Sequence, residues 1–423
     1  MGQSLRVGTA EVDITPPVGT LLAGSLKPRP SVGVDNPLFA KAIVLESDGH
    51  RLAYVALDLV SLGRDTGGDE AVRRASAATG IPEDHIAYAC SHTHTGPYTH
   101  KRREEYIDAA WFGALPERIA TAVQRADAAK VPARLSRCRA FEWRTHANRR
   151  VRFKDGRHVN RWLLDNPINA PLQAVCTAGP IDPEVGMLAF DSLDGDLLAV
   201  MYHFTLHANS DFGPKFSADY PGVVSERLRE AFGPQTVALF MPGCCGDINP
   251  THKHLATGNF LAEPMVAALR TRQPSADPVP LGACKRRLTV PLRNLELDQE
   301  ERLAKCGWPK ELNEVFRQGQ ARLRAEGIQQ VETWIGAFRI GEVGFVTLPG
   351  EVFVDWQVLI KERSPFAWTY PVELSNDSLG YLITRDAWEG GGYEALTGAS
   401  TCIDVNGVHL LVDRSLDLLQ SLR

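Results

Sequence analysis

Apolar segments of strand length alternate along the chain with segments of helical periodicity. The strand-like segments are 51–60, 85–90, 196–204, 236–242 and 344–349. The helix-like segments are 69–80, 103–129, 221–233 and 297–327. This alternation predicts an α/β layered fold. No linker rich in Pro, Gly or Ser separates two halves of the sequence, so we expect residues 1–423 to form one domain.

Individual residues refine the expected helices. Gly80 and Gly233 follow the last periodic positions of two helices and are expected to end them, while Pro221 lies in the first turn of the second. Pro116 is expected to kink or divide segment 103–129, because proline has no backbone N–H to donate. The charged segment 297–327 is expected to pack on the outside of the fold.

Composition narrows the class of protein. The chain has 44% hydrophobic and 23% charged residues and a formal net charge of −5. This balance argues against a nucleic-acid-binding protein, because phosphate contacts require an excess of Lys and Arg. The N-terminus has no export signal, and no apolar run reaches the length of a membrane helix, about 18 residues. We therefore expect no stable membrane insertion and a cytoplasmic location, in which the eight cysteines stay reduced.

Polar loops follow several of the predicted strands. His92, His94 and His100 come after segment 85–90, and His207 comes after segment 196–204. Further loops carry the Gly-Cys-Cys-Gly-Asp sequence from residue 243, Glu351, and Tyr381. Ligands of α/β sheets bind beyond the carboxyl ends of the strands. We therefore expect these five loops to share one site.

The His-x-His pair is the sharpest local motif. His92 and His94 point the same way if the segment is extended, and neutral imidazole is a common metal ligand. The alternative is that one or both histidines only bond to backbone in a turn. His207 on a second strand-end loop favours the metal. His203 lies four residues earlier and is either a rival or supporting ligand or, as we favour, a buried core histidine.

Several longer motifs resemble those of the neutral/alkaline (non-lysosomal) ceramidase family. They are VGTAEVDITPPVG (7–19), SHTHTGP (91–97), the His-Ala-Asn loop with His207, GCCGDINP (243–250), LPGEVF (348–353) and GYLIT…GGYEALTGAST (380–401). They occur in the family's order and span most of the chain. The resemblance implies the family's catalytic-domain fold, a layered α/β sandwich of mixed sheets.

The same resemblance implies a zinc site formed by His92, His207, Glu351 and Tyr381. Two imidazoles, a carboxylate and a phenol suit Zn²⁺. On its own, Glu351 is equally explained as a favourable charge at a helix N-terminus, and Tyr381 as a strand core residue. The ligand roles of these two residues therefore rest on the resemblance.

Four further residues are assigned from the resemblance. His94, Arg149 and Tyr393 are implied to hold the scissile carbonyl and its developing charge, and Gly24 is implied to line the site. Gly24 alone also fits an ordinary turn. Arg149 competes with Arg150 and Arg152, and this basic run is alternatively a solvated loop or a binding site for an anionic group.

Three aspartates are weaker candidates for supporting roles. Asp58 is a candidate to orient a ligand histidine, whereas Asp219 is expected to cap a helix. Asp247 is expected to brace the site from its loop.

The sequence departs from the family at the nucleophile. Aligning on Gly246-Asp247 places Gly243 where the family's serine is expected, next to Cys244 and Cys245. Three interpretations compete: attack by zinc-bound hydroxide, a Cys244 thiolate nucleophile, or inert packed cysteines. We favour the first together with the third, and place Gly243 and Cys244 among the expected substrate-binding residues. The family's C-terminal immunoglobulin-like domain is also expected to be missing.

These residues predict a zinc-dependent hydrolase that cleaves an amide (N-acyl) bond of a soluble small molecule through zinc-activated water. The alternatives are a zinc hydrolase of an ester, lactone or other polar linkage, and a non-catalytic metal-binding relative. The expected partner is the small-molecule substrate, and the sequence gives no support for a homo-oligomer.

Overall fold

The larger of two main sheets has eight strands. The computed structural model describes residues 5–25, 28–165, 169, 173–275, 278–296, 299–306, 310–398 and 401–423. The strand order is β14 (Val237–Pro242), β13 (Leu197–Phe204), β12 (Glu184–Ser192), β7 (Val131–Phe141), β1 (Arg6–Asp13), β4 (Phe39–Ser47), β5 (His50–Leu57), β6 (Ile86–Cys90). The outermost pair at each edge is parallel, and the inner pairs are antiparallel.

A second sheet packs against the first through a shared apolar core. Its strand order is β16 (Leu281–Pro291), β17 (Gln330–Ile340), β18 (Val343–Thr347), β20 (Trp368–Val372), and the last pair is parallel. Strand β4 illustrates why two faces are buried. Ile43 and Leu45 face the second sheet and share a cluster with Phe345, whereas Ala42 and Val44 point into the helices on the other side.

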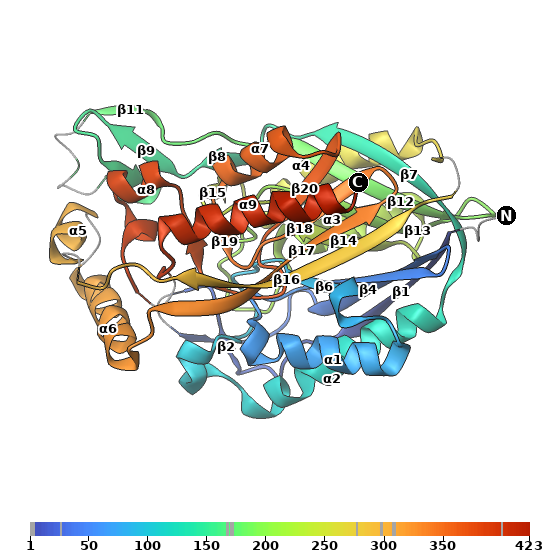
Figure 1. Cartoon of the computed structure of the whole chain (residues 1–423), viewed down its shortest axis with the longest axis horizontal. Helices are drawn as coiled ribbons and strands as arrows, with labels where there is room; N and C mark the ends of the chain where they lie inside the picture. The colour runs from blue at the N-terminus through green and yellow to red at the C-terminus, as the bar shows by residue number, and fades with distance from the viewer. Residues whose placement is uncertain are drawn as a thin grey trace.

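Helices cover both outer faces, so the molecule has four layers in the order α/β/β/α. Helices α1 (Gly68–Thr79) and α2 (Ala109–Ala128) cover one half of the large sheet. Helices α3 (Asp219–Phe232) and α4 (His254–Arg270) cover the other half. Helices α7 (Val354–Arg363) and α9 (Val405–Ser421) cover the second sheet, and Figure 1 shows α9 and α1 on opposite sides of the strands. The predicted layered sandwich of mixed sheets is confirmed.

Apart from α6, the remaining elements are short. The helices are α5 (Gln299–Cys306), α6 (Lys310–Glu326) and α8 (Arg385–Gly390), with 3₁₀ turns at Arg64–Thr66, Glu83–His85, Lys101–Tyr106, Arg161–Leu163 and Tyr393–Ala395. The strands are β2 (Leu21–Leu22), β3 (Arg29–Pro30), β8 (His146–Asn148), β9 (Arg150–Phe153), β10 (His158–Asn160), β11 (Ala174–Thr177), β15 (Ile248–Pro250), β19 (Glu351–Val352) and β21 (Tyr381–Leu382). None of the described helices combines the length and hydrophobicity that a bilayer-spanning segment requires.

The observed helix boundaries confirm most expectations and correct one. Gly80 and Gly233 directly follow α1 and α3, as predicted. Segment 103–129 differs, because α2 begins at Ala109, capped by Asp108, and continues through Pro116 without division. Proline removes one backbone donor, and the buried face formed by Trp111, Leu115 and Ile119 holds the helix together across that gap.

Candidate metal centre and pocket

The candidate site lies where loops leave the carboxyl ends of parallel strands. His92 follows β6, His207 follows β13, and Glu351 follows β18. Tyr381 lies beyond β20, and the short parallel pair of β19 with β21 places Glu351 directly opposite Tyr381. Strand ends from both main sheets therefore bring together residues that are almost 300 positions apart in sequence.

Three buried acceptor atoms meet at the centre of the site. Glu351 Oε2 lies 3.3 Å from His92 Nε2 and 3.5 Å from His207 Nε2. The other ring nitrogens face carbonyl oxygens: His92 Nδ1 lies 2.7 Å from Val60 O, and His207 Nδ1 lies 2.6 Å from Cys245 O. Because a carbonyl only accepts, each Nδ1 carries the proton and each Nε2 presents a lone pair.

This arrangement fits a cation. His207 Nε2 and Glu351 Oε2 have no hydrogen-bond partner among the described residues. Burial and the neighbouring His92 lower the pKa of His207 to about 4, so His207 is neutral at physiological pH, as a ligand must be. Burial also acts to lower the pKa of His92, but the Glu351 carboxylate beside it leaves that pKa raised. Two imidazoles and a carboxylate are a donor set suited to Zn²⁺.

Tyr381 and His94 are two candidates for a further ligand. Burial and Glu351 raise the pKa of Tyr381 well above its ordinary value, and only a nearby dication would favour the phenolate. His94 also lies close, since its imidazole, that of His92 and that of His207 offer nitrogens within 4.8 Å of one another. Both ring nitrogens of His94 are buried without a partner among the described residues.

Backbone conformation at His92 and Gly24 supports the site. His92 has φ of 65°, a left-handed conformation that is rare and costly for a non-glycine residue and is often found at functional sites. Gly24 has φ of 78°, and a Cβ there would lie 2.5 Å from His94 Cα. Gly24 therefore lets its loop pack directly against His94, which a larger residue would displace.

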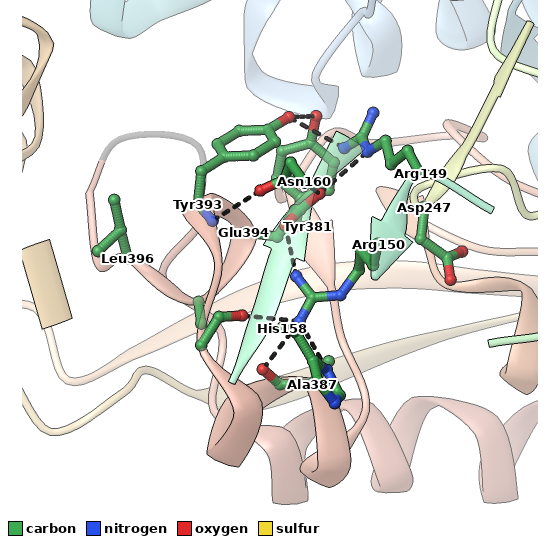
Figure 2. A network of polar contacts seen from close by, with 12 residues as sticks. Arg149, Arg150, His158, Asn160, Asp247, Tyr381, Ala387, Tyr393, Glu394 and Leu396 are labelled. Atoms are coloured by element: carbon green, nitrogen blue, oxygen red, sulfur yellow. Dashed lines mark hydrogen bonds and ion pairs between the residues drawn. The ribbon is translucent and has the colours of Figure 1, made fainter. Parts of the chain in front are cut away.

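Arg149 forms part of the polar wall of the same site. Its guanidinium donates from Nη2 to Tyr393 Oη at 3.0 Å, from Nη1 to Asn249 Oδ1 at 3.1 Å, and from Nε to Glu394 Oε1 at 3.0 Å. Figure 2 shows Tyr393 and Tyr381 meeting through their hydroxyls beside it. Burial raises the pKa of Tyr393, so this hydroxyl keeps its proton and remains a donor.

The basic run after Arg149 is only partly a solvated loop. Arg149 and Arg150 are each 2% exposed, whereas Arg152 and Arg157 carry exposed hydrogen bonds to surface aspartates. Arg149 lines the pocket and Arg150 does not. The two side chains leave neighbouring positions in opposite directions (Figure 2), which sequence alone does not reveal.

One pocket with a volume of about 680 Å³ is lined by Gly24, His92, His94, Arg149, Glu351, Tyr381 and Tyr393. His207 is fully buried beside Glu351 and does not line it. The other walls of the pocket include Trp162, Phe212 and Phe316, with Asn209 and Asn249 beside Arg149. Segment 297–327 was expected to pack on the outside of the fold, and its helix α6 also contributes to the pocket. Helices α5 and α6 lie at one end of the molecule (Figure 1). Part of the pocket wall is nevertheless formed by the α6 residues Val315, Phe316, Gln318, Gly319 and Arg322.

Many of these pocket residues were not identified from the sequence, among them two asparagines and three aromatic residues. Asn209 follows His207 by two positions, and Asn249 lies inside the GCCGDINP motif, so motif spacing is a signal that would have indicated both. Trp162, Phe212 and Phe316 belong to no motif, and only the tertiary packing brings them to the pocket.

Gly243 and Cys244 do not line the pocket, contrary to expectation. A Cβ at Gly243 would lie 2.4 Å from Thr205 Oγ1, so this position faces packed protein and leaves no room for a serine side chain. Cys244 is fully buried in an apolar cluster, and burial raises the pKa of its thiol well above the ordinary value. Neither residue is placed to contact a substrate.

Cys245 is also engaged elsewhere. Its thiol donates to Glu373 Oε1 at 2.9 Å, and burial followed by the Glu373 charge raises its pKa. Its carbonyl oxygen is the acceptor that orients His207. Both cysteines are therefore packed thiols, and Cys245 supports the site through its backbone.

Replacing Cys244 with alanine tests this conclusion. We expect Cys244→Ala to retain bound metal and to keep kcat/KM within about twofold of the wild type, because the thiol touches no reacting group. Steady-state kinetics and metal content measured on the same sample check this. A loss of kcat at full metal content would instead support a thiolate nucleophile.

The three aspartates differ in their roles. Asp58 accepts a hydrogen bond from Phe39 N at 3.0 Å and lies 3.9 Å from Lys41 Nζ, so it does not orient a ligand histidine as hypothesised. Asp219 begins α3 and accepts hydrogen bonds from Tyr220 N and Asp211 N. It therefore satisfies backbone donors at the helix start.

Asp247 and His203 occupy the positions predicted for them. Asp247 accepts from Asn148 Nδ2 at 2.7 Å and from Val354 N at 2.9 Å, and its carbonyl accepts from Arg149 N. It thereby connects the strand before Arg149 to the start of α7. His203 is a buried core histidine whose Nε2 lies 2.8 Å from Pro371 O.

Comparisons with known proteins agree with this fold. No protein-family model matches the chain. A neutral ceramidase of Pseudomonas aeruginosa is 28% identical over 261 residues, which are 58% of this chain and 37% of that protein. The matched region thus spans little more than a third of that relative's length.

Two solved structures superpose on nearly the whole chain. A crystal structure of neutral ceramidase from Pseudomonas aeruginosa has a TM-score of 0.74 and 20% identity, and covers 99% of this chain and 75% of its own. A ceramidase described as complexed with C2 has a TM-score of 0.76 and 18% identity, with the same coverage. The chain therefore has the fold of these ceramidase structures, and part of it is similar in sequence to a neutral ceramidase.

Proposed function

We propose that this protein is a zinc-dependent hydrolase that cleaves the amide (N-acyl) bond of a small molecule. The observation that carries the proposal is that His92 Nε2 and His207 Nε2 both approach Glu351 Oε2. They do so at a pocket that His92, Glu351, Arg149 and Tyr393 line. Homology to a neutral ceramidase supports an amide as the bond cleaved.

The proposed ligands are His92, His207, Glu351 and Tyr381. When bound, Zn²⁺ supplies a Lewis acid and lowers the pKa of water to about 7. The chain prepares these ligands through the carbonyls of Val60 and Cys245, which fix the tautomer and the ring orientation of the two histidines. We favour Glu351 over His94 as a ligand, because a buried carboxylate accepts only and needs a cation or donors.

The remaining pocket residues are proposed to act on the carbonyl of the scissile bond. Tyr393 keeps its single hydroxyl proton, which we propose turns from the Tyr381 oxygen toward the carbonyl oxygen as negative charge develops there. Arg149 holds the Tyr393 oxygen and adds a fixed positive charge. Burial lowers the pKa of His94 well below its ordinary value, so this imidazole is neutral and donates one N–H to the same oxygen.

Pocket size supports a small substrate. A volume of about 680 Å³ lies in the usual range for drug-sized ligands. Trp162, Phe212 and Phe316 provide an apolar surface for the acyl part, and Asn209 and Asn249 provide amides for a polar part. We therefore propose a compact N-acyl compound in preference to a lipid with two long chains.

A substrate panel tests the bond type. We expect the zinc-loaded protein to hydrolyse short N-acyl amides, and removal of zinc with a chelator to abolish this activity reversibly. Matched esters and lactones with the same acyl group form the comparison set. Hydrolysis of esters or lactones without any amide cleavage would overturn the amide assignment, and full activity after complete zinc removal would overturn the metal mechanism.

A further inference from the structure

A single carboxylate is buried between two arginines behind the pocket wall. Glu394 is fully buried, and Arg149 and Arg150 are each 2% exposed. Glu394 Oε1 accepts hydrogen bonds from Arg149 Nε at 3.0 Å and from Asn160 Nδ2 at 2.9 Å. Its Oε2 accepts from Arg150 Nη1 at 2.5 Å (Figure 2). Each oxygen of Glu394 thus holds a different arginine.

Arg149 has no freedom to swing into the pocket. Its Nε, Nη1 and Nη2 donate to Glu394, Asn249 and Tyr393 respectively. The guanidinium therefore acts from a fixed position, through its charge and through the hydroxyl of Tyr393. Of these partners, Glu394 is the only carboxylate, so it is the strongest restraint on Arg149.

The segment carrying Tyr393 needs external anchors. Tyr393 follows three consecutive glycines, and Gly391 and Gly392 have φ of 82° and 85°. Such a segment has high intrinsic backbone freedom. Arg150 anchors it by donating from Nη2 to Gly391 O at 2.7 Å, and Asn160 Oδ1 accepts from Tyr393 N at 3.3 Å.

The network also leaves an excess of positive charge. The positive charges of Arg149 and Arg150 face the single negative charge of Glu394, whose pKa is lowered by these arginines despite its burial. The other acceptors of Arg150 are the carbonyls of Gly391 and Ala387 and the ring of His158, which are uncharged groups. Glu394 therefore does not neutralise both arginines, although Asp247 and Asp355 also act electrostatically on Arg150. The charge of Arg149 is the one that lines the pocket, where it favours an oxyanion.

We propose that Glu394 is a positioning residue that presets the two carbonyl-binding donors. It fixes Arg149 directly, and it fixes the segment of Tyr393 through Arg150 and Asn160. The inference rests on the proposed function in one respect, namely that Arg149 and Tyr393 act on the carbonyl of the scissile bond.

Two methionine variants separate positioning from stability. Glu394→Met removes both acceptors at similar volume and leaves two unpaired buried guanidiniums. The double variant Glu394→Met with Arg150→Met leaves only one unpaired buried guanidinium, that of Arg149. We expect kcat to fall about 10²-fold in both variants at nearly constant KM and zinc content, because the donors are misplaced. The urea midpoint should fall in the first variant and largely recover in the second. Recovery of kcat together with the midpoint, or wild-type kcat in Glu394→Met, would overturn the proposal.

A milder pair of variants covers the case in which these proteins fail to fold. Asn160→Ala keeps both arginine–carboxylate pairs and removes the bonds to Glu394 and to Tyr393 N. We expect about tenfold lower kcat, since one of several restraints is lost. Arg152 lies on the neighbouring strand β9 and forms an exposed ion pair, so Arg152→Ala is the control and should keep wild-type kcat. Equal kcat in both variants would count against the proposal.

A spectroscopic measurement is independent of catalysis. The Trp162 ring lies 5.5 Å from the Arg149 guanidinium carbon and 5.8 Å from the Tyr393 ring centre. We expect the near-ultraviolet dichroism of Trp162, obtained by difference from Trp162→Phe, to change in Asn160→Ala and not in Arg152→Ala. If the wild type cleaves no amide, the proposed function fails while this signal still reports on positioning. An unchanged Trp162 signal would contradict the inference whatever the activity.

Discussion

Replacing His92 with alanine is expected to remove the bound metal and hydrolysis together. The variant leaves His207 and Glu351 in place but deletes one of the two imidazoles whose Nε2 atoms approach Glu351 Oε2. We expect zinc content to fall from about one per chain to near zero. We expect kcat/KM to fall at least about a thousandfold, because several kcal/mol of Lewis-acid stabilisation are lost. Elemental analysis and kinetics on the same sample measure both quantities.

An exposed histidine provides the control. His252→Ala lies outside the pocket and should keep both zinc and activity. Glu351→Gln and His94→Ala then distinguish the two donor sets. The first should lose zinc, and the second should keep zinc while kcat falls. Zinc retained in Glu351→Gln and lost in His94→Ala would replace the proposed ligand set with the three histidines.

The second large effect is expected at Arg149. Arg149→Met removes the donor to Tyr393 and the positive charge nearest the carbonyl site, and it leaves Glu394 paired with Arg150. The remaining pair is balanced in charge, so we expect a folded protein with full zinc content. We expect kcat to fall about 10²–10³-fold with a smaller change in KM, the pattern produced by loss of an oxyanion donor.

The opposite kinetic pattern for Arg149→Met would contradict a role for Arg149 in stabilising the oxyanion. An unchanged kcat with a raised KM would show that Arg149 binds the substrate equally in its ground state. Zinc content and the urea midpoint of the variant are measured alongside, so that a folding defect is not mistaken for a catalytic one.

Sequence patterns predicted the layers of the fold because buried strands and amphipathic helices carry strong local signals. The segments 51–60 and 196–204 are almost wholly apolar, and in the structure the corresponding strands β5 and β13 are covered on both faces. Pro116 does not divide α2, because the effect of a proline depends on the packing of the helix face around it.

The residues of the site were harder to predict from the sequence, because tertiary contacts bring them together. Glu351 and Tyr381 are each ordinary in their local sequence, and only the pairing of β19 with β21 places them together. Gly243 was placed at the site by linear alignment, but that alignment does not determine which residue of a turn faces the pocket. In the structure the residue of this motif that faces the pocket is Asn249, because β15 pairs with β8 beside Arg149.

The arginine run shows the same limit. Arg149 and Arg152 lie on one short stretch, yet one is buried against Glu394, which is 245 residues away, and the other lies at the surface. Burial of a charge requires a partner, and the partner's approach is a property of the fold.

Anomalous diffraction at the zinc edge tests the central claim most directly. We predict one strong peak at about 2.0–2.2 Å from His92 Nε2, His207 Nε2, a Glu351 oxygen and Tyr381 Oη. A crystal of the zinc-loaded protein with no peak at this position, or with a peak bound by His92, His94 and His207 without Glu351 and Tyr381, would contradict the proposed metal centre.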